Sequence, residues 1–165
     1  MTLVLYDMEN IKVSKRAVSK IAKKFDIVKL KNEIEQHCQD GLYKHVSFLS
    51  IYNDNTINFK TMLKSNGFEV ISKKSVLKKA DFNGMKYTYR DSDIDAKIVN
   101  YAHCYYKEYD TIVFVTGDGD MYTVMRRISN QKHLVVFGWE DNTASKIKDS
   151  FEYVSLDKLI EKQKI

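Results

Sequence analysis

The sequence contains no proline, and only six of its 165 residues are glycine. Flexible linkers and low-complexity segments are usually rich in one or both, so the chain offers little material for either. Its two cysteines, Cys38 and Cys104, are too few for a disulfide framework, and their separation matches no common zinc-binding pattern. We therefore expect a single domain over residues 1–165.

Long apolar runs are also missing, and none approaches the roughly 20 residues of a membrane span. The first residues carry Asp7 and Glu9 and lack the basic stretch that opens a secretion signal. Apolar residues nevertheless make up 44% of the chain, which is enough for a substantial core. These features predict a soluble, cytoplasmic protein with no membrane partner.

The net charge is +5, from 27 lysines and arginines against 22 acids. Several acids fall into short clusters, so the remaining surface is more basic than the total suggests. One interpretation is that the lysines keep a small protein soluble. The other is that a basic rim neutralises the phosphates of a polyanion around an acidic pocket.

Apolar runs and helical spacing alternate along the chain. A mostly parallel sheet covered by helices on both faces, an α/β three-layer sandwich, is the fold that this alternation predicts. Residues 72–90 show no clear period, and no element is assigned to residues 32–43. The expected strands are residues 2–6, 45–52, 68–71, 111–115, 134–137 and 153–156. The expected helices are residues 14–25 (with Ser14 as cap), 56–66, 94–106, 121–128, 143–148 and the basic C-terminal end.

Acidic residues stand where these apolar runs end. Asp7 and Asp118 each follow an expected strand, while Asp93 and Asp95 open an expected helix. The ends of parallel strands meet at one edge of a sheet, where an open α/β fold places its ligand site. Carboxylates crowd together only when a cation holds them, so the pattern predicts a divalent-metal site.

Each cluster also has a structural alternative. Asp7 with Asn10 is typical of a strand-to-helix turn, and either Asp118 or Asp120 could cap a helix. Two glycines flank Asp118, however, and leave room for a ligand beside its carboxylate. Three acids precede or begin the next expected helix, although one cap needs only one acid and the surplus acids repel one another: Asp91, Asp93 and Asp95.

The order of these motifs resembles the NYN domain family of PIN-like nucleases, which includes the LabA-like bacterial proteins. The resemblance covers roughly residues 2–156. It rests on Asp7-x-x-Asn10, Asp95 at the start of a central helix, Gly117-Asp118-Gly119-Asp120 after an apolar strand, and Val135-Val136-Phe137-Gly138 followed by Ala144-Ser145. It implies a PIN-like α/β/α fold whose acidic pocket binds Mg²⁺ or Mn²⁺ to cleave RNA.

Carried over by position, the resemblance makes Asn10 a polar partner of an acidic set formed by Asp7, Asp95, Asp118 and Asp120. Members often have Lys-Gly before the central acid, whereas residues 90–95 here read Arg-Asp-Ser-Asp-Ile-Asp. Either Asp93 or Asp95 could therefore face the metal. Gly119 also stands where members often have serine, which removes one hydroxyl from the pocket.

Candidate substrate contacts lie beside the first and second acidic clusters: Lys12, Lys15, Arg16, Lys86, Tyr89 and Arg90. If residues 85–90 are extended, Tyr87 and Tyr89 share a face on which unpaired bases can stack. The alternative is an edge strand that packs its tyrosines inward, which we favour for Tyr87 more than for Tyr89.

The expected function is a metal-dependent ribonuclease, an endonuclease with RNA as its partner. Phosphodiester hydrolysis needs an activated water and relief of charge on the leaving oxygen, and carboxylate-held divalent ions provide both. The alternative is a non-catalytic PIN-like module that binds RNA or a protein. A phosphatase is disfavoured because no Asp-x-Asp-x-Thr follows the first strand. PIN-like proteins often pair, but no pattern here identifies a homodimer interface or a protein partner.

Overall fold

The computed structural model describes the backbone of residues 1–17, 26–91 and 93–162, with side chains except those of residues 13–17, 90, 91 and 162. No helix in these ranges is both long and apolar enough to cross a membrane. The strands are β1 (Thr2–Asp7), β2 (Tyr43–Ile51), β3 (Glu69–Lys74), β4 (Val76–Phe82), β5 (Met85–Asp91), β6 (Thr111–Val115), β7 (His133–Gly138) and β8 (Glu152–Ser155). The helices are α1 (Met8–Ala17), α2 (Ile27–Cys38), α3 (Asp54–Ser65), α4 (Ile94–Tyr105), α5 (Tyr122–Ser129), α6 (Ser145–Ser150) and α7 (Leu156–Lys162), with 3-10 turns η2 (Tyr106–Glu108), η3 (Gly119–Met121) and η4 (Glu140–Asn142).

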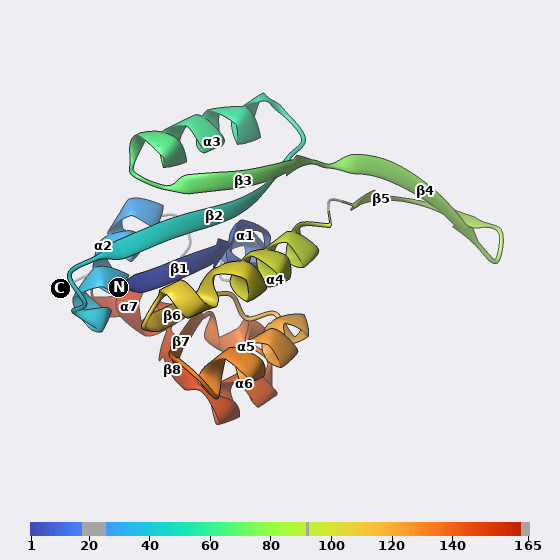
Figure 1. The fold of residues 1–165 in the computed structure, drawn as a ribbon. Coiled ribbons are helices and arrows are strands. Elements are labelled where there is room, and N and C mark those ends of the chain that lie inside the picture. Colours follow the sequence, from blue (N-terminus) through green and yellow to red (C-terminus); the bar gives the residue numbers. More distant parts are fainter. Residues whose placement is uncertain (18–25, 92, 163–165) are drawn as a thin grey trace.

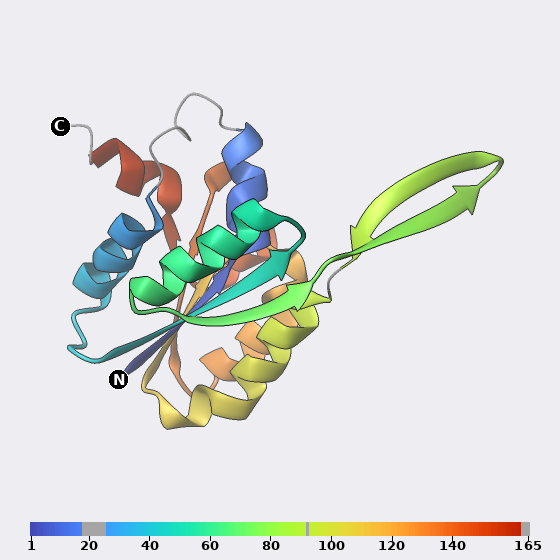
Figure 2. The ribbon, with the colours of Figure 1, turned by 90° about the horizontal axis from the view of Figure 1, so that it is seen from above.

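Six strands form one parallel sheet in the order β3-β2-β1-β6-β7-β8 (Figure 1). Helices α4, α5 and α6 cover one face, and α1, α2, α3 and α7 cover the other (Figure 2). In β1, Leu3 and Leu5 join the first core, whereas Val4 and Tyr6 join the second. A strand buried on both faces reads as a continuous apolar run. The expected α/β/α sandwich is thus confirmed.

The sheet changes its direction of winding between its two central strands, β1 and β6. The chain leaves β1 into α1 on one face, and it leaves β6 through η3 into α5 on the other. At such a switch point the two connections diverge and open a crevice at the carboxyl ends of the strands. Asp7 ends β1, and residues 116–118 directly follow β6, so both acidic motifs lie at this switch point.

Two helices depart from the sequence-based expectation. Helix α1 begins at Met8, directly after β1, so the predicted start at residue 14 and the Ser14 cap are wrong; residues 18–25 lie outside the described ranges. Residues 27–38, for which no helix was predicted, form α2. The Asp26 side chain caps this helix by accepting a hydrogen bond from the Val28 N–H.

Most of the segment without a clear period forms a two-stranded antiparallel hairpin, β4 and β5, hereafter the arm (Val76–Asp91), while its first residues, 72–74, belong to β3. Its two-residue turn is Asn83-Gly84, with φ values of 52° and 76°. Positive φ at both positions is the requirement of the tight turn that joins right-twisted strands. The arm projects away from the body of the molecule in both views (Figures 1 and 2).

Candidate functional site

Asp7 is the buried member of the site, with 2% of its surface exposed. One carboxylate oxygen accepts the backbone N–H of Asn10 at 3.1 Å. The other accepts the Thr116 hydroxyl at 2.8 Å. Both bonds fix the carboxylate at the end of β1, and the second ties it to the end of the neighbouring strand, β6.

Asp118 follows β6 and is held by the same threonine. Its backbone N–H donates to the Thr116 hydroxyl oxygen at 3.1 Å. One carboxylate oxygen accepts the N–H of Asp120 at 2.9 Å and so caps η3. Asp118 therefore does cap η3, as one alternative predicted, and its carboxylate also lies close to those of Asp7 and Asp95.

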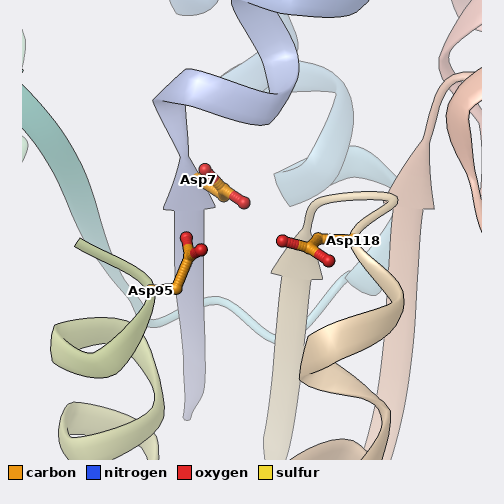
Figure 3. Close-up of side chains that lie close together, drawn as sticks. All are labelled: Asp7, Asp95 and Asp118. Atoms are coloured by element: carbon orange, nitrogen blue, oxygen red, sulfur yellow. The ribbon is translucent and has the colours of Figure 1, made fainter. Parts of the chain in front are cut away.

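Asp95 reaches the same place from the first turn of α4 (Figure 3). Asp7, Asp95 and Asp118 each offer one carboxylate oxygen, and these three oxygens lie within 4.8 Å of one another. The three acids come from three separate segments of the chain. The structure thus brings together, at the switch point, three of the carboxylates that were predicted to converge, whereas Asp93 and Asp120 do not join them.

The environment of Asp7 disfavours its ionised form. Burial raises the pKa of its carboxyl from 3.8 to about 6, against the lowering effect of the hydrogen bonds from Asn10 and Thr116. Repulsion from Asp95 and Asp118 raises the pKa further. A cation placed among the three carboxylates would relieve both effects.

Asp95 shows the same tendency in a more exposed position. Desolvation by the surrounding protein raises the pKa of Asp95, and repulsion from Asp118, Asp120 and Glu9 adds to it. Asp120 is exposed at the start of η3. Asp120 is therefore a neighbour of the three-carboxylate group and not one of its members.

Asn10 and Asp93 have other partners. The side-chain oxygen of Asn10 accepts the N–H of Gly117 at 2.8 Å, which joins the turn after β1 to the turn after β6. Asp93 precedes α4 with φ of 45° and does not cap it with its side chain. Its carboxylate instead accepts a 2.6 Å hydrogen bond from the Lys73 ammonium. Asp95, two residues later, is the acid that turns toward Asp7.

Glycine is required at the end of β6. A Cβ at Gly117 would lie 2.5 Å from the carbonyl oxygen of Asn142 and 2.7 Å from the Thr143 hydroxyl. A Cβ at Gly138 would collide with the same hydroxyl. The Ala144 N–H donates to the Gly117 carbonyl at 3.0 Å, so the loop after β7 packs directly against the segment that carries the site.

The structure describes the side chains of only three of the six predicted substrate contacts, Lys12, Lys86 and Tyr89. The Lys12 ammonium lies 4.4 Å from the centre of the Phe59 ring. Lys86 and Tyr89 are exposed on the arm, as is Tyr87, so inward packing of that tyrosine is wrong. The remaining predicted contacts have side chains outside the described ones: Lys15, Arg16 and Arg90.

Sequence reasoning missed Lys146 and the arm. The side chain of Lys146 lies against Gly119, with Cε 3.1 Å from where a Cβ would stand, and its ammonium is 5.3 Å from the centre of the Tyr122 ring. Nothing distinguishes this lysine among 27 basic residues in the sequence. The arm did have a signal, since Asn83-Gly84 is a typical two-residue hairpin turn.

The chain belongs to the NYN domain family, whose model matches residues 1–157. This places it in the PIN-like nuclease superfamily. It is also similar to the crystal structure of a protein of unknown function from Vibrio parahaemolyticus, with a TM-score of 0.73 and 21% identity, over 94% of this chain and 92% of the other. At that identity the likeness shows the fold alone. No curated protein matches the chain significantly.

Nucleases of this family use divalent metal ions, and the residues present fit such an ion. Three carboxylate oxygens within 4.8 Å of one another match the hard oxygen ligands that such cations prefer. Burial, and after it repulsion between neighbouring acids, raises the pKa of two of the three carboxyls, those of Asp7 and Asp95, and a cation would favour their ionised forms. Asp7, Asp95 and Asp118 are thus the candidate ligands.

Proposed function

We propose that this protein is a divalent-metal-dependent endoribonuclease, with Mg²⁺ or Mn²⁺ as its cofactor. The observation that carries the proposal is the convergence of Asp7, Asp95 and Asp118 at the switch point of the sheet. The family match supports the reaction class, because the PIN-like group consists of nucleases. Placement among the LabA-like bacterial members remains a prediction.

Two of the three candidate ligands are held in place by hydrogen bonds. Asp7 is held from two sides, through both of its carboxylate oxygens. Asp118 is held through its backbone by Thr116. Asp95 is exposed, which leaves its side open to a substrate. Ligands that are fixed in advance give up little freedom when a cation binds.

A divalent cation held here would activate a water molecule and relieve charge on the leaving oxygen of a phosphodiester. The protein's own residues would bind and orient the RNA. Lys146 beside Gly119 is a candidate phosphate contact at this rim. Asp120, exposed next to Asp118, is a candidate to hold a water molecule or a second cation. Asn10 acts as a positioning residue through Gly117.

The test is cleavage of a panel of single-stranded, hairpin and duplex RNA by the purified protein in Mn²⁺, Mg²⁺ or EDTA. Asp118→Asn removes one charge from the site, and Asp149→Asn removes one from the exposed surface of α6 as a matched control. We expect cleavage that requires metal, disappears in Asp118→Asn and persists in Asp149→Asn. Undiminished cleavage by Asp118→Asn would overturn the assignment.

RNA binding without cleavage would favour the alternative, a PIN-like module that binds RNA or a protein and does not cut. That alternative predicts RNA binding that is equal in the parent protein and in Asp118→Asn, and that is insensitive to EDTA. Internal cleavage of a circular RNA, which has no ends, would separate an endonuclease from an exonuclease. The same panel with DNA strands tests whether the 2′-hydroxyl is required.

A further inference from the structure

The arm presents two chemically different faces. Residues directly opposite in an antiparallel pair point to the same side, and successive residues along a strand point to opposite sides. The register pairs Lys78 with Tyr89, Ala80 with Tyr87 and Phe82 with Met85. These six residues share one face, hereafter the aromatic face. The other face carries mainly polar groups: Lys79, Asp81, Lys86 and Thr88.

The aromatic face is exposed along its length. Phe82 and Met85 are each 64% exposed, Tyr89 is 49% exposed and Tyr87 is 43% exposed. A two-stranded ribbon alone is marginally stable in water. Contiguous exposed apolar surface on a soluble domain usually marks a binding site. The arm therefore has the character of a docking surface.

Charge and ring chemistry together identify the occupant. The arm carries four lysines and arginines against two acids, Asp81 and Asp91. Tyr87 and Tyr89 lie two residues apart on one strand, so their rings start about 7 Å from each other. Lys78 stands opposite Tyr89 on the same face. Aromatic rings interleaved with basic side chains are the combination that binds single-stranded nucleic acid, through base stacking and phosphate contacts.

The base of the arm is joined to the acidic site. Lys73 in β3, just before the arm, donates to the Asp93 carboxylate at 2.6 Å. Asp93 directly precedes α4, and Asp95 lies in the first turn of that helix. A strand of RNA that lay along the arm would therefore lead toward the three carboxylates.

We propose that the aromatic face of the arm binds single-stranded RNA by stacking bases on Tyr87 and Tyr89, and guides the strand to the acidic site. The proposal rests on the proposed ribonuclease function for its choice of RNA. Unpaired RNA is selected because bases in a duplex do not expose their faces to a side chain. The arm is thus a specificity element that favours single-stranded over duplex substrate.

The test measures equilibrium binding of a fluorescein-labelled single-stranded RNA to the full chain carrying Asp118→Asn, in which RNA is preserved. In this background Tyr87→Ala/Tyr89→Ala should weaken binding by about tenfold or more, since each stacked base contributes substantially. Tyr87→Phe/Tyr89→Phe keeps both rings and should bind within about twofold of the parent. Tyr105→Ala, at an exposed tyrosine on α4, is the matched control and should change nothing.

Tyr87→Leu/Tyr89→Leu separates stacking from general apolar docking, because it keeps apolar surface without an aromatic ring. We expect this variant to bind as weakly as the alanine variant. Parent-like binding by the leucine or the alanine variant would overturn the proposal. The proposal would also be overturned if the parent is a dimer and the alanine variant is a monomer that binds RNA as the parent does. That result would show that the aromatic face binds a second copy of this chain.

Failure of the arm proposal can be told apart from failure of the ribonuclease proposal. Binding is measured in the Asp118→Asn background, so it tests the arm even if the parent protein cleaves nothing. If the arm variants bind RNA normally while the parent cleaves in a metal-dependent way, the arm proposal fails and the nuclease stands. If both proposals hold, the alanine variant should lose more cleavage on long single-stranded RNA than on a strand too short to reach the arm.

Discussion

The side chain of Asn10 accepts a hydrogen bond from the backbone N–H of Gly117 at 2.8 Å, across 107 positions of sequence. A second bond, from the Thr116 hydroxyl to Asp7, runs beside it at 2.8 Å. Together they join the turn after β1 to the turn after β6, which carry two of the three converging carboxylates. Asn10 therefore acts on the site by fixing the distance between its halves.

Asn10→Ala should lower both stability and cleavage. The variant leaves the buried N–H of Gly117 without its acceptor, which costs about 1–3 kcal/mol of unfolding free energy. Denaturant unfolding measures that loss, and the RNA cleavage rate measures its effect on the site. Asn58→Ala, at an exposed position of α3, is the control and should change neither. Unchanged stability of Asn10→Ala would show that the bond does not hold the two turns.

The raised pKa of Asp7 predicts an unusual pH dependence in metal-free protein. Because burial raises this pKa from 3.8 to about 6, ionising Asp7 costs more in the folded than in the unfolded state. Its contribution to the free energy of unfolding should therefore fall by about 3 kcal/mol as pH rises from 4 to above 6, and then stay constant.

Asp7→Asn removes this dependence. In EDTA at about pH 7.5 the variant should be more stable than the parent, although altered bonding to Thr116 offsets part of the gain by about 1 kcal/mol. The advantage should shrink toward about pH 4.5, where the Asp7 of the parent is mostly protonated. Thermal unfolding at several pH values measures the difference. Parallel curves for the two proteins would show that Asp7 ionises without penalty.

The two glycines beside Asp118 should differ in their tolerance of a side chain. Gly117→Ala places a methyl 2.5 Å from the Asn142 carbonyl oxygen, and overpacking against backbone costs about 1–3 kcal/mol. At Gly119 the nearest atom is Cε of Lys146, the far part of a flexible side chain at 3.1 Å. Gly119→Ala should therefore cost clearly less. Denaturant unfolding of both variants checks the order, and an equal loss would contradict it.

The central fold could be predicted from sequence because its strands are buried on both faces, which gives uninterrupted apolar runs such as residues 111–115. The arm could not be predicted from such a pattern. Neither of its faces packs against a core, and apolar and polar residues do not alternate regularly in β4, where Val76 is followed by Leu77 and Lys78 by Lys79. The start of α1 was also missed, because the chain turns directly from Asp7 into the helix without a separate cap.

The acidic site was predictable in part. Each acid's position relative to a strand or helix end predicted convergence, and the structure brings Asp7, Asp95 and Asp118 together. Sequence could not choose between Asp93 and Asp95, which both stand at the start of α4. That choice depends on Lys73, a residue 20 positions earlier that binds Asp93. Lys146 was missed because its place beside Gly119 depends on how the loop after β7 packs.

Comparing Asp95 with Asp93 tests most directly whether the three-carboxylate group holds the metal ion that cleavage requires. The two acids lie two residues apart, but only Asp95 belongs to the three-carboxylate group, while Asp93 binds Lys73. The measurement is the RNA cleavage rate of Asp95→Asn and Asp93→Asn across a Mn²⁺ titration. We expect Asp95→Asn to lose cleavage at every metal concentration and Asp93→Asn to retain most of it. Cleavage lost in Asp93→Asn and retained in Asp95→Asn would show that Asp95 is not a metal ligand.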